Sequence, residues 1–199
     1  MGYHRAGFEV VGVDSKPQPH YPFEFHQADA LTYPLDGFNA YHASPPCQAY
    51  TRLTPPEHRD NHPDLIEPTR DRLQATGCPF VIENVPDALF KLNNPLMLCG
   101  TMFELPTHRH RYFEIEPPYY PLLPRCQRIR LPIVVSGTTR RKTGRLEYRV
   151  SEVKTAMMID WMTRLELDGA IPPAYTEFIG KYLLDVLTTH KGYSEKGEQ

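Results

Sequence analysis

Short apolar runs alternate with polar, proline-containing connections over the first 115 residues. Residues 8–13 (FEVVGV) are one such run, which predicts a buried strand with Asp14 at its carboxyl end. The same pattern predicts further strands at 23–27, 38–44, 80–82 and 111–115. Helical spacing at 64–75, ended by Gly77, predicts a helix between two of these strands. This alternation favours an α/β fold with a mostly parallel sheet and helices on both faces.

The pattern changes after residue 115. Residues 116–149 are rich in Pro, Arg, Gly and Thr and are predicted to form an inserted loop region with one strand at 133–135. Two helices are predicted beyond it, at 151–164 with Ser151 as N-cap and at 172–189 opened by two prolines. The predicted organisation is therefore a core at 1–115, a basic region at 116–149, helices returning to the core at 150–190, and a flexible tail at 191–199.

Composition narrows the class of protein. A chain of 199 residues fits one domain with a sizeable core. No run approaches the roughly 20 apolar residues of a membrane span, and the first residues lack a signal-peptide pattern. The sequence therefore predicts a cytoplasmic protein without a membrane partner. The cysteines, Cys47, Cys78, Cys99 and Cys126, form no C-x-x-C pair, so we expect reduced thiols, no metal, and at least one thiol available for catalysis.

The formal net charge of −2 conceals a strongly basic segment. Between residues 125 and 149 there are eight basic residues and one acid, which makes the segment +7 and the remainder of the chain −9. Such a patch suits a polyanion, although a solvated loop is the alternative. The residues expected to contact nucleic acid are Arg125, Arg128, Arg130, Arg140, Arg141, Lys142 and Arg145.

Four chemically useful side chains each follow a predicted strand: Asp14, Asp29, Cys47 and Glu83. Because ligands of open α/β sheets bind at the carboxyl ends of strands, we expect these groups to converge on one edge. The alternative is that such polar residues only end strands and begin turns.

Three short segments suggest a reaction. In Ser44–Gln48 (SPPCQ), two prolines fix the backbone ahead of Cys47, and a thiol at a strand tip near a helix start can have a lowered pKa, as a nucleophile needs. Burial would raise the pKa of Glu83 and suit it to donate a proton to a ring nitrogen. Arg109 and Arg111, at strand spacing, would point to one side and could bind a base carbonyl or a phosphate. A structural cysteine and a charged edge strand are the alternatives.

In this order the segments resemble the motifs of the DNA (cytosine-5) methyltransferase family, especially its small phage-encoded members. The matching segments are PCQ at 46–48, ENV at 83–85, LCGTMF at 98–103, RHR at 109–111, AMMIDWMTRL at 156–165 and AIPPAY at 170–175 followed by Ile179 and Gly180. The resemblance covers nearly the whole chain. It implies a Rossmann-like class I methyltransferase fold, S-adenosylmethionine as methyl donor, and double-stranded DNA as partner of a monomer.

The resemblance also implies a role for each matching residue. Cys47 would attack carbon 6 of a flipped-out cytosine, and carbon 5 would take the methyl group. Glu83 would engage ring nitrogen 3, while Arg111 and Arg109 would hold the base carbonyl oxygen. Asp14 would bind the cofactor ribose, Asp29 the adenine amino group, and Pro45 and Pro46 would line the pocket.

Two features depart from the family. Its opening strand and F-x-G-x-G-G turn have no counterpart, since residues 1–8 resemble the helix that follows that turn. The strands beside the missing one would lose a partner. A start assigned to an internal Met and a truncated chain are the favoured explanations, ahead of a degenerate or split enzyme. The second departure is the short recognition region at 116–149, whose phosphate contacts would position DNA without reading its sequence.

Two other functions remain open at this point. A catalytically inactive relative could keep the fold and bind DNA or a protein partner. A cysteine hydrolase would need a histidine paired with Cys47, and His42 is the nearest in sequence.

Overall fold

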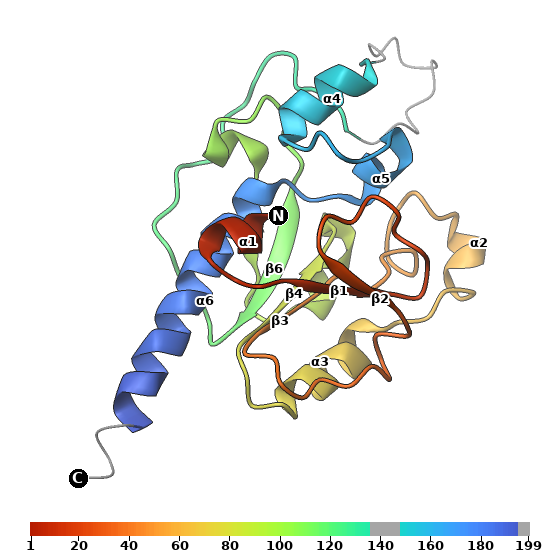
Figure 1. Cartoon of the computed structure of the whole chain (residues 1–199). Coiled ribbons are helices and arrows are strands. Elements are labelled where there is room, and N and C mark those ends of the chain that lie inside the picture. The colour runs from red at the N-terminus through yellow and green to blue at the C-terminus, as the bar shows by residue number, and fades with distance from the viewer. Residues whose placement is uncertain (136–147, 195–199) are drawn as a thin grey trace.

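Short strands form two small sheets in the computed structural model, which describes residues 1–135 and 148–194, with side chains to residue 189. The protein is mixed α/β with several helices (Figure 1). The strands are β1 (Val11–Asp14), β2 (Glu24–Gln27), β3 (Tyr41–Ala43), β4 (Phe80–Asn84), β5 (Leu96–Leu98) and β6 (Arg111–Glu116). The α-helices are α1 (Gly2–Ala6), α2 (Pro56–Arg59), α3 (Ile66–Gln74), α4 (Val150–Met157), α5 (Arg164–Gly169) and α6 (Pro173–Ser194). Two 3₁₀ helices, Pro86–Lys91 and Gly100–Phe103, flank β5.

The sheets are less parallel than the sequence pattern predicts. β1 pairs in parallel with β2, and β3 pairs in parallel with β4. β6 runs antiparallel to both β4 and β5, so that the larger sheet has the order β3-β4-β6-β5. A parallel neighbour needs a long crossover, usually a helix, whereas the segments around β5 contain only short 3₁₀ turns. β5 itself was not predicted.

Helices cover both faces of the larger sheet, as predicted. Along β4, Phe80 and Ile82 pack with Ile66 and Leu73 of α3, whereas Val81 belongs to a cluster on the other side. That second cluster contains Tyr175, Ile179 and Leu183 of α6. Alternate residues of a strand face opposite sides, so the uninterrupted apolar run at 80–82 fills two cores at once.

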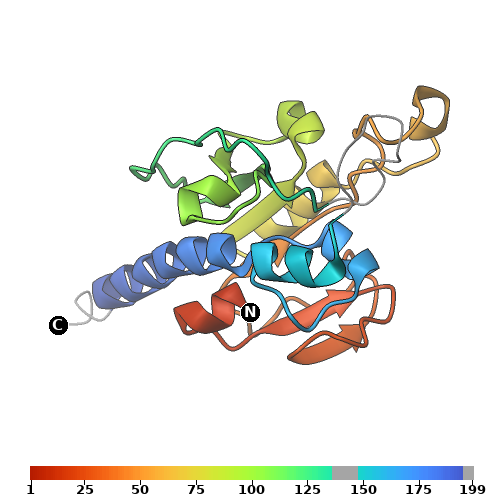
Figure 2. The same ribbon diagram turned by 90° about the horizontal axis from the view of Figure 1, so that it is seen from above.

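Helix α1 lies against the first half of α6 (Figures 1 and 2). The contact is close because of two glycines. A Cβ atom on Gly180 would lie 2.7 Å from Cβ of Ala6, and one on Gly2 would lie 2.1 Å from the carbonyl oxygen of Pro173. The resemblance predicts a helix in residues 1–8, and α1 occupies that position.

Two predictions for the second half of the chain are wrong. Residues 133–135 form no strand, although Val135 is buried against Val153 and Met157. Only the first half of the range predicted at 151–164 is one helix. α4 ends at Met157, because the backbone turns left-handed at Met158 (φ 54°), and the second part, α5, begins only at Arg164. α4 begins one residue before Ser151, with Arg149 as N-cap. Thr163 caps the second part through a hydrogen bond with the Glu166 backbone.

β1 and β3 are not hydrogen-bonded to each other, so a gap separates the two sheets. Cavities of about 430 and 390 Å³ are both lined by residues of these two strands. β1 and β3 therefore face each other across these cavities and are not neighbours in one continuous sheet. Among the described helices, none is both long and apolar enough to cross a bilayer.

Candidate functional site

A buried ion pair joins the end of β4 to the beginning of β6. The Nε–H of Arg111 donates to Oε1 of Glu83 at 2.9 Å, and the two side chains are only 12% and 9% exposed. The antiparallel register, with Asn84 opposite Tyr112, places the two residues side by side. Burial raises the pKa of Glu83, while the charge of Arg111 and a hydrogen bond from Ser44 oppose that rise. Glu83 therefore has the raised pKa expected of a proton donor.

The loop that carries Cys47 is hydrogen-bonded to the end of β4, next to the ion pair. Asn84 donates from Nδ2 to the carbonyl oxygen of Pro45 at 3.0 Å, and Pro45 is buried. The backbone N–H groups of Tyr50 and Thr51 donate to the carbonyl oxygen of Cys47 at 3.0 and 2.9 Å. The half-buried thiol therefore sits in a tight turn held against β4.

The pKa of Cys47 moves in the direction opposite to the prediction. Burial raises it, and the negative charge of Glu83 adds to the rise, whereas the charges of Arg111 and Arg109 lower it. The sequence suggested a helix start beside the thiol, but residues 48–50 form a turn. Without a helix N-terminus, the groups that favour the thiolate are Arg111, a backbone hydrogen bond at Cys47 itself and Arg109.

His42 forms part of a hydrogen-bonded row that the sequence analysis did not predict. Its Nδ1 lies 2.7 Å from the hydroxyl oxygen of Tyr3, and its Nε2 lies 3.2 Å from Oγ of Ser44. Burial lowers the pKa of His42 to about 4, so the ring is neutral near pH 7. Both ring nitrogens are engaged by oxygen atoms, which weighs against the hydrolase alternative. The i, i+2 spacing of His42 and Ser44 on a strand was the available signal.

Arg109 does not share the orientation predicted from strand spacing. β6 begins only at Arg111, and the backbone at Arg109 has a φ of 22°. Its Nε donates to the carbonyl oxygen of Ala170 at 3.0 Å, and its NH2 group donates to the carbonyl oxygens of Asp168 and Ala170, each at 2.6 Å. Burial and the charge of Arg111 lower the pKa of Arg109 to about 9. Arg109 thus ties β6 to the segment before α6.

The four residues predicted to bind a cofactor all line one cavity. This hollow of about 390 Å³ is lined by Asp14, Asp29, Pro45 and Pro46, and its volume lies in the range of about 300–1,000 Å³ typical of small-molecule sites. Oδ1 of Asp14 accepts from the Lys16 backbone at 2.8 Å, and Oδ1 of Asp29 accepts from the Leu31 backbone at 2.9 Å. These bonds hold the carboxylates in place.

Arg72 adds a third charged group to the lining of that cavity. Its Nε is buried and, within the described part of the chain, has no hydrogen-bond partner. A buried donor without a partner costs free energy unless a ligand or water satisfies it. Two fixed carboxylates beside apolar lining residues suit a small ligand that carries hydroxyl or amino groups.

The basic residues fall into two groups. Arg125, Arg128 and Arg130 are exposed on the irregular stretch that follows β6, where they are accessible to a large partner. Arg140, Arg141, Lys142 and Arg145 lie outside the described residues. A contact of either group with DNA therefore stays a prediction.

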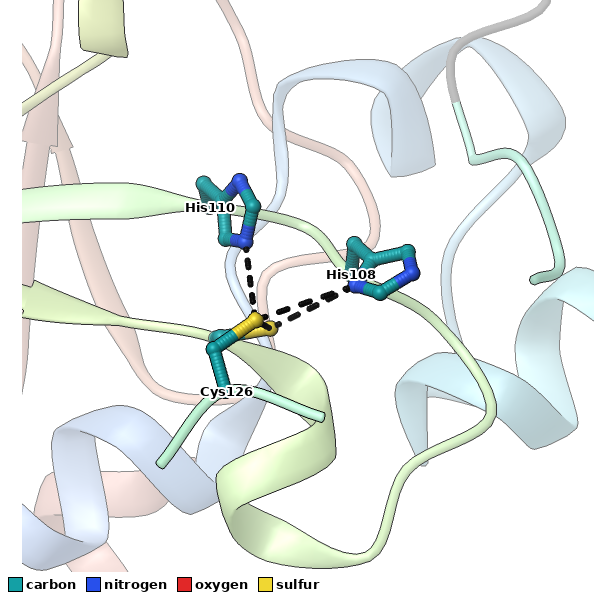
Figure 3. Close-up of side chains that lie close together, drawn as sticks. His108, His110 and Cys126 are labelled. Atoms are coloured by element: carbon teal, nitrogen blue, oxygen red, sulfur yellow. Dashed lines mark hydrogen bonds between the residues drawn. The ribbon is translucent and has the colours of Figure 1, made fainter. Parts of the chain in front are cut away.

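Four potential metal ligands gather where β5 ends and β6 begins: Cys99, His108, His110 and Cys126. Their ligand atoms all lie within 4.8 Å of one another, and Figure 3 shows His108 and His110 directed toward the sulfur of Cys126. The expectation of no metal rested on the lack of a C-x-x-C pair, and that pattern does not detect these ligands. The H-x-H spacing at 108–110, flanked by a cysteine on each side, was the signal available in the sequence.

Compared with known proteins, the chain has no significant match among protein-family models, curated proteins or solved structures.

Proposed function

We propose that this protein is an S-adenosylmethionine-dependent DNA cytosine-5 methyltransferase with a Rossmann-like core and with Cys47 as nucleophile. One observation carries the proposal. Glu83 forms a buried ion pair with Arg111, and its neighbour Asn84 holds the Cys47 loop through Pro45, beside the cavity lined by Asp14 and Asp29. A nucleophile, a proton donor and a cation beside a nucleoside-sized hollow suit chemistry on a pyrimidine ring.

Cys47, Glu83 and Arg111 have different roles in the proposed reaction on the target base. The thiolate of Cys47 forms a bond to carbon 6, which moves an electron pair toward carbon 5. Glu83, whose pKa is raised, hydrogen-bonds or protonates nitrogen 3 and makes the ring a better electron sink. Arg111 offers guanidinium N–H groups to the base carbonyl oxygen. After carbon 5 gains its substituent, loss of the carbon-5 proton and breakage of the sulfur–carbon bond restore the thiolate.

S-adenosylmethionine would supply an electrophilic methyl group to this site. Asp14 is suited to accept hydrogen bonds from ribose hydroxyls, and Asp29 to accept one from the adenine amino group. Pro45 and Pro46 line the same cavity as Asp14 and Asp29 and directly precede Cys47. Their loop therefore connects the cofactor cavity with the place where the target base would react. Arg109 in turn positions the C-terminal segment against β6 and is a positioning residue in this scheme.

An inactive relative that binds DNA or a partner is the second candidate. The separation of β1 from β3 favours it, because that gap lies where the family has its opening strand and glycine-rich turn. A protein with a hollow at this place would keep the other residues and yet turn over slowly or not at all.

The deciding experiment is transfer of a labelled methyl group from S-adenosylmethionine to cytosine-containing duplex DNA. Wild-type protein is compared with Cys47→Ser and with Cys78→Ser, whose thiol faces the carbonyl oxygen of Phe38 instead. Label at carbon 5 that is lost only in Cys47→Ser supports the enzyme. If the wild-type protein binds DNA but transfers no label to it, the enzyme proposal is rejected in favour of the inactive relative.

A further inference from the structure

We propose that Cys99, His108, His110 and Cys126 bind one Zn²⁺ ion in a structural site that fastens the irregular segment after β6 to the core. This proposal does not depend on methyl transfer. The four ligands come from three segments: the residue after β5, the residues just before β6, and the middle of the exposed basic stretch.

The distances are close to those of a tetrahedral site. The Sγ atoms of Cys99 and Cys126 are 3.1 Å apart, and Nε2 of His110 lies 3.3 Å from Sγ of Cys126. Nδ1 of His108 lies 3.8 Å from the first sulfur and 3.9 Å from the second. In a tetrahedral site, zinc bonds of about 2.3 Å to sulfur and about 2.0 Å to nitrogen place two sulfur atoms about 3.8 Å apart. They place a sulfur and a nitrogen atom about 3.5 Å apart. Shifts of less than about 1 Å would complete the coordination.

The set of ligands selects the kind of ion. Two thiolates and two imidazoles are a common zinc set and suit a borderline-soft cation, whereas calcium and magnesium prefer oxygen ligands. Four protein ligands leave no open position for water or substrate, which indicates a structural role. Cys99 is completely buried and the other three ligands are partly buried, so a bound ion would be shielded from solvent.

The backbone around the cluster is organised for close approach. A Cβ atom on Gly100 would lie 2.2 Å from the carbonyl oxygen of Thr107, so only glycine lets these segments meet. The N–H of Gly100 donates to the carbonyl oxygen of His108 at 3.1 Å. Oγ1 of Thr101 lies 3.2 Å from Sγ of Cys99 and accepts from the Gln127 backbone at 3.0 Å. These contacts hold all three ligand-bearing segments together.

A disulfide is the alternative use of the two cysteines. Both are free thiols, and their 3.1 Å separation exceeds the roughly 2.05 Å of a disulfide bond. A disulfide would also leave His108 and His110 without a role. The position of Cys126 suggests what the metal would do. Tyr119 and Leu123 pack the first part of the irregular segment against the core, and a metal bound by Cys126 would hold the part that follows.

The first test is the metal content of wild-type protein purified in reducing buffer without chelator, incubated with excess Zn²⁺ and desalted. We expect about one zinc per chain in the wild-type protein and in the control Cys78→Ser. Cys126→Ser and His108→Ala should retain only background zinc. Less than about 0.2 zinc per wild-type chain, or a Cys99–Cys126 disulfide that persists under reduction, would overturn the proposal.

The second test keeps four ligands in each protein compared. Titration of metal-free wild-type protein with Co²⁺ should give the intense visible bands of a tetrahedral ion together with thiolate charge-transfer absorption, saturating at one equivalent. His110→Cys should still bind one equivalent and should increase the charge-transfer band, since it adds a third thiolate. A weak octahedral spectrum without charge transfer in the wild-type protein would reject the Cys₂His₂ site.

Discussion

The side chain of Asn84 donates to the carbonyl oxygen of Pro45 at 3.0 Å and fixes the Cys47 loop to the end of β4. Asn84 also accepts from the Val85 backbone through Oδ1 at 2.9 Å, so its amide is held at both ends. The residue is 2% exposed. The consequence is that Glu83, its neighbour on β4, and Cys47 keep a constant relative position.

Replacement of Asn84 by Ala should lower the rate of methyl transfer about 100-fold with little change in DNA affinity. A nucleophile displaced by about 1 Å can cost this much, although the replaced side chain never touches substrate. Measurement of kcat and KM separately tests the positioning role, since kcat should fall and KM should not. Asn39→Ala, at an exposed position before β3, is the control and should behave as wild type. A parallel change in both constants would contradict this role.

Glu83→Gln should slow methyl transfer by about 10²–10⁴, the usual contribution of general acid–base catalysis. The amide is nearly the same size but cannot donate a carboxylic proton to nitrogen 3. DNA affinity should change far less, which filter binding or anisotropy would show. Glu116→Gln, at the exposed end of β6, is the matched control. A rate equal to that of the wild-type protein would remove Glu83 from the mechanism.

Alkylation of Cys47 should be slow at neutral pH and should accelerate as the pH rises. Burial raises its pKa, so the thiolate fraction increases about tenfold per pH unit until the pH passes that pKa. Iodoacetamide labelling followed by peptide mass spectrometry gives the midpoint for this thiol alone. Arg111→Gln should move the midpoint upward, because the lost positive charge favoured the thiolate. A midpoint below that of free cysteine would contradict the argument.

A second buried ion pair, between Arg70 and Glu114, should dominate the stability of the core beside α3. Nε and NH2 of Arg70 donate to the two carboxylate oxygens at 2.6 and 2.8 Å, with 10% and 6% of the side chains exposed. Arg70→Ala should cost about 3–5 kcal/mol in the free energy of unfolding, because Glu114 would be left as an unpaired buried charge. Urea denaturation measures this cost.

The double variant Arg70→Met with Glu114→Leu should be less destabilised than the sum of its single variants, since no charge remains buried. Lys181→Ala, which breaks an exposed pair with Glu177, should change stability by less than about 1 kcal/mol. Additive effects of the two buried changes would show that the pair is not coupled.

Charge reversal at Arg128 and Arg130 should weaken DNA binding and reduce its salt dependence. If both contact phosphates, the slope of log K against log salt should fall by about 2 in magnitude. Arg5→Glu, exposed on α1, is the control for a charge reversal placed elsewhere on the protein. The same slope in the reversed variant and in the wild-type protein would place the DNA surface elsewhere.

Local patterns predicted most of the elements that surround the candidate site. The apolar run at 80–82 identified β4, and the prolines before α6 identified its start. The approximate position of Asp14, Cys47 and Glu83 at strand ends also followed from the pattern. These features depend on residues close together in the chain, whose periodicity and turn chemistry can be read directly.

Other features depended on contacts between distant segments. Strand spacing predicted Arg109 and Arg111 on one side, but Arg109 precedes β6 and binds the carbonyl oxygens before α6. The pKa of Cys47 was predicted to be lowered but is raised by burial of the thiol. Burial depends on how the whole fold packs around a residue. The partner of Arg70 lies on a strand 44 residues away, which no local pattern reveals.

The sequence by itself therefore determined which groups are available and which strand ends carry them: a thiol after one strand, carboxylates after three others, and two arginines around the start of a fifth. Only the tertiary structure decided how they combine, pairing Glu83 with Arg111, enclosing Asp14 and Asp29 around one cavity, and gathering two cysteines with two histidines. The physical reason is that charge pairing, desolvation and metal coordination depend on distances of a few ångströms between atoms, and those distances are set by packing rather than by position along the chain.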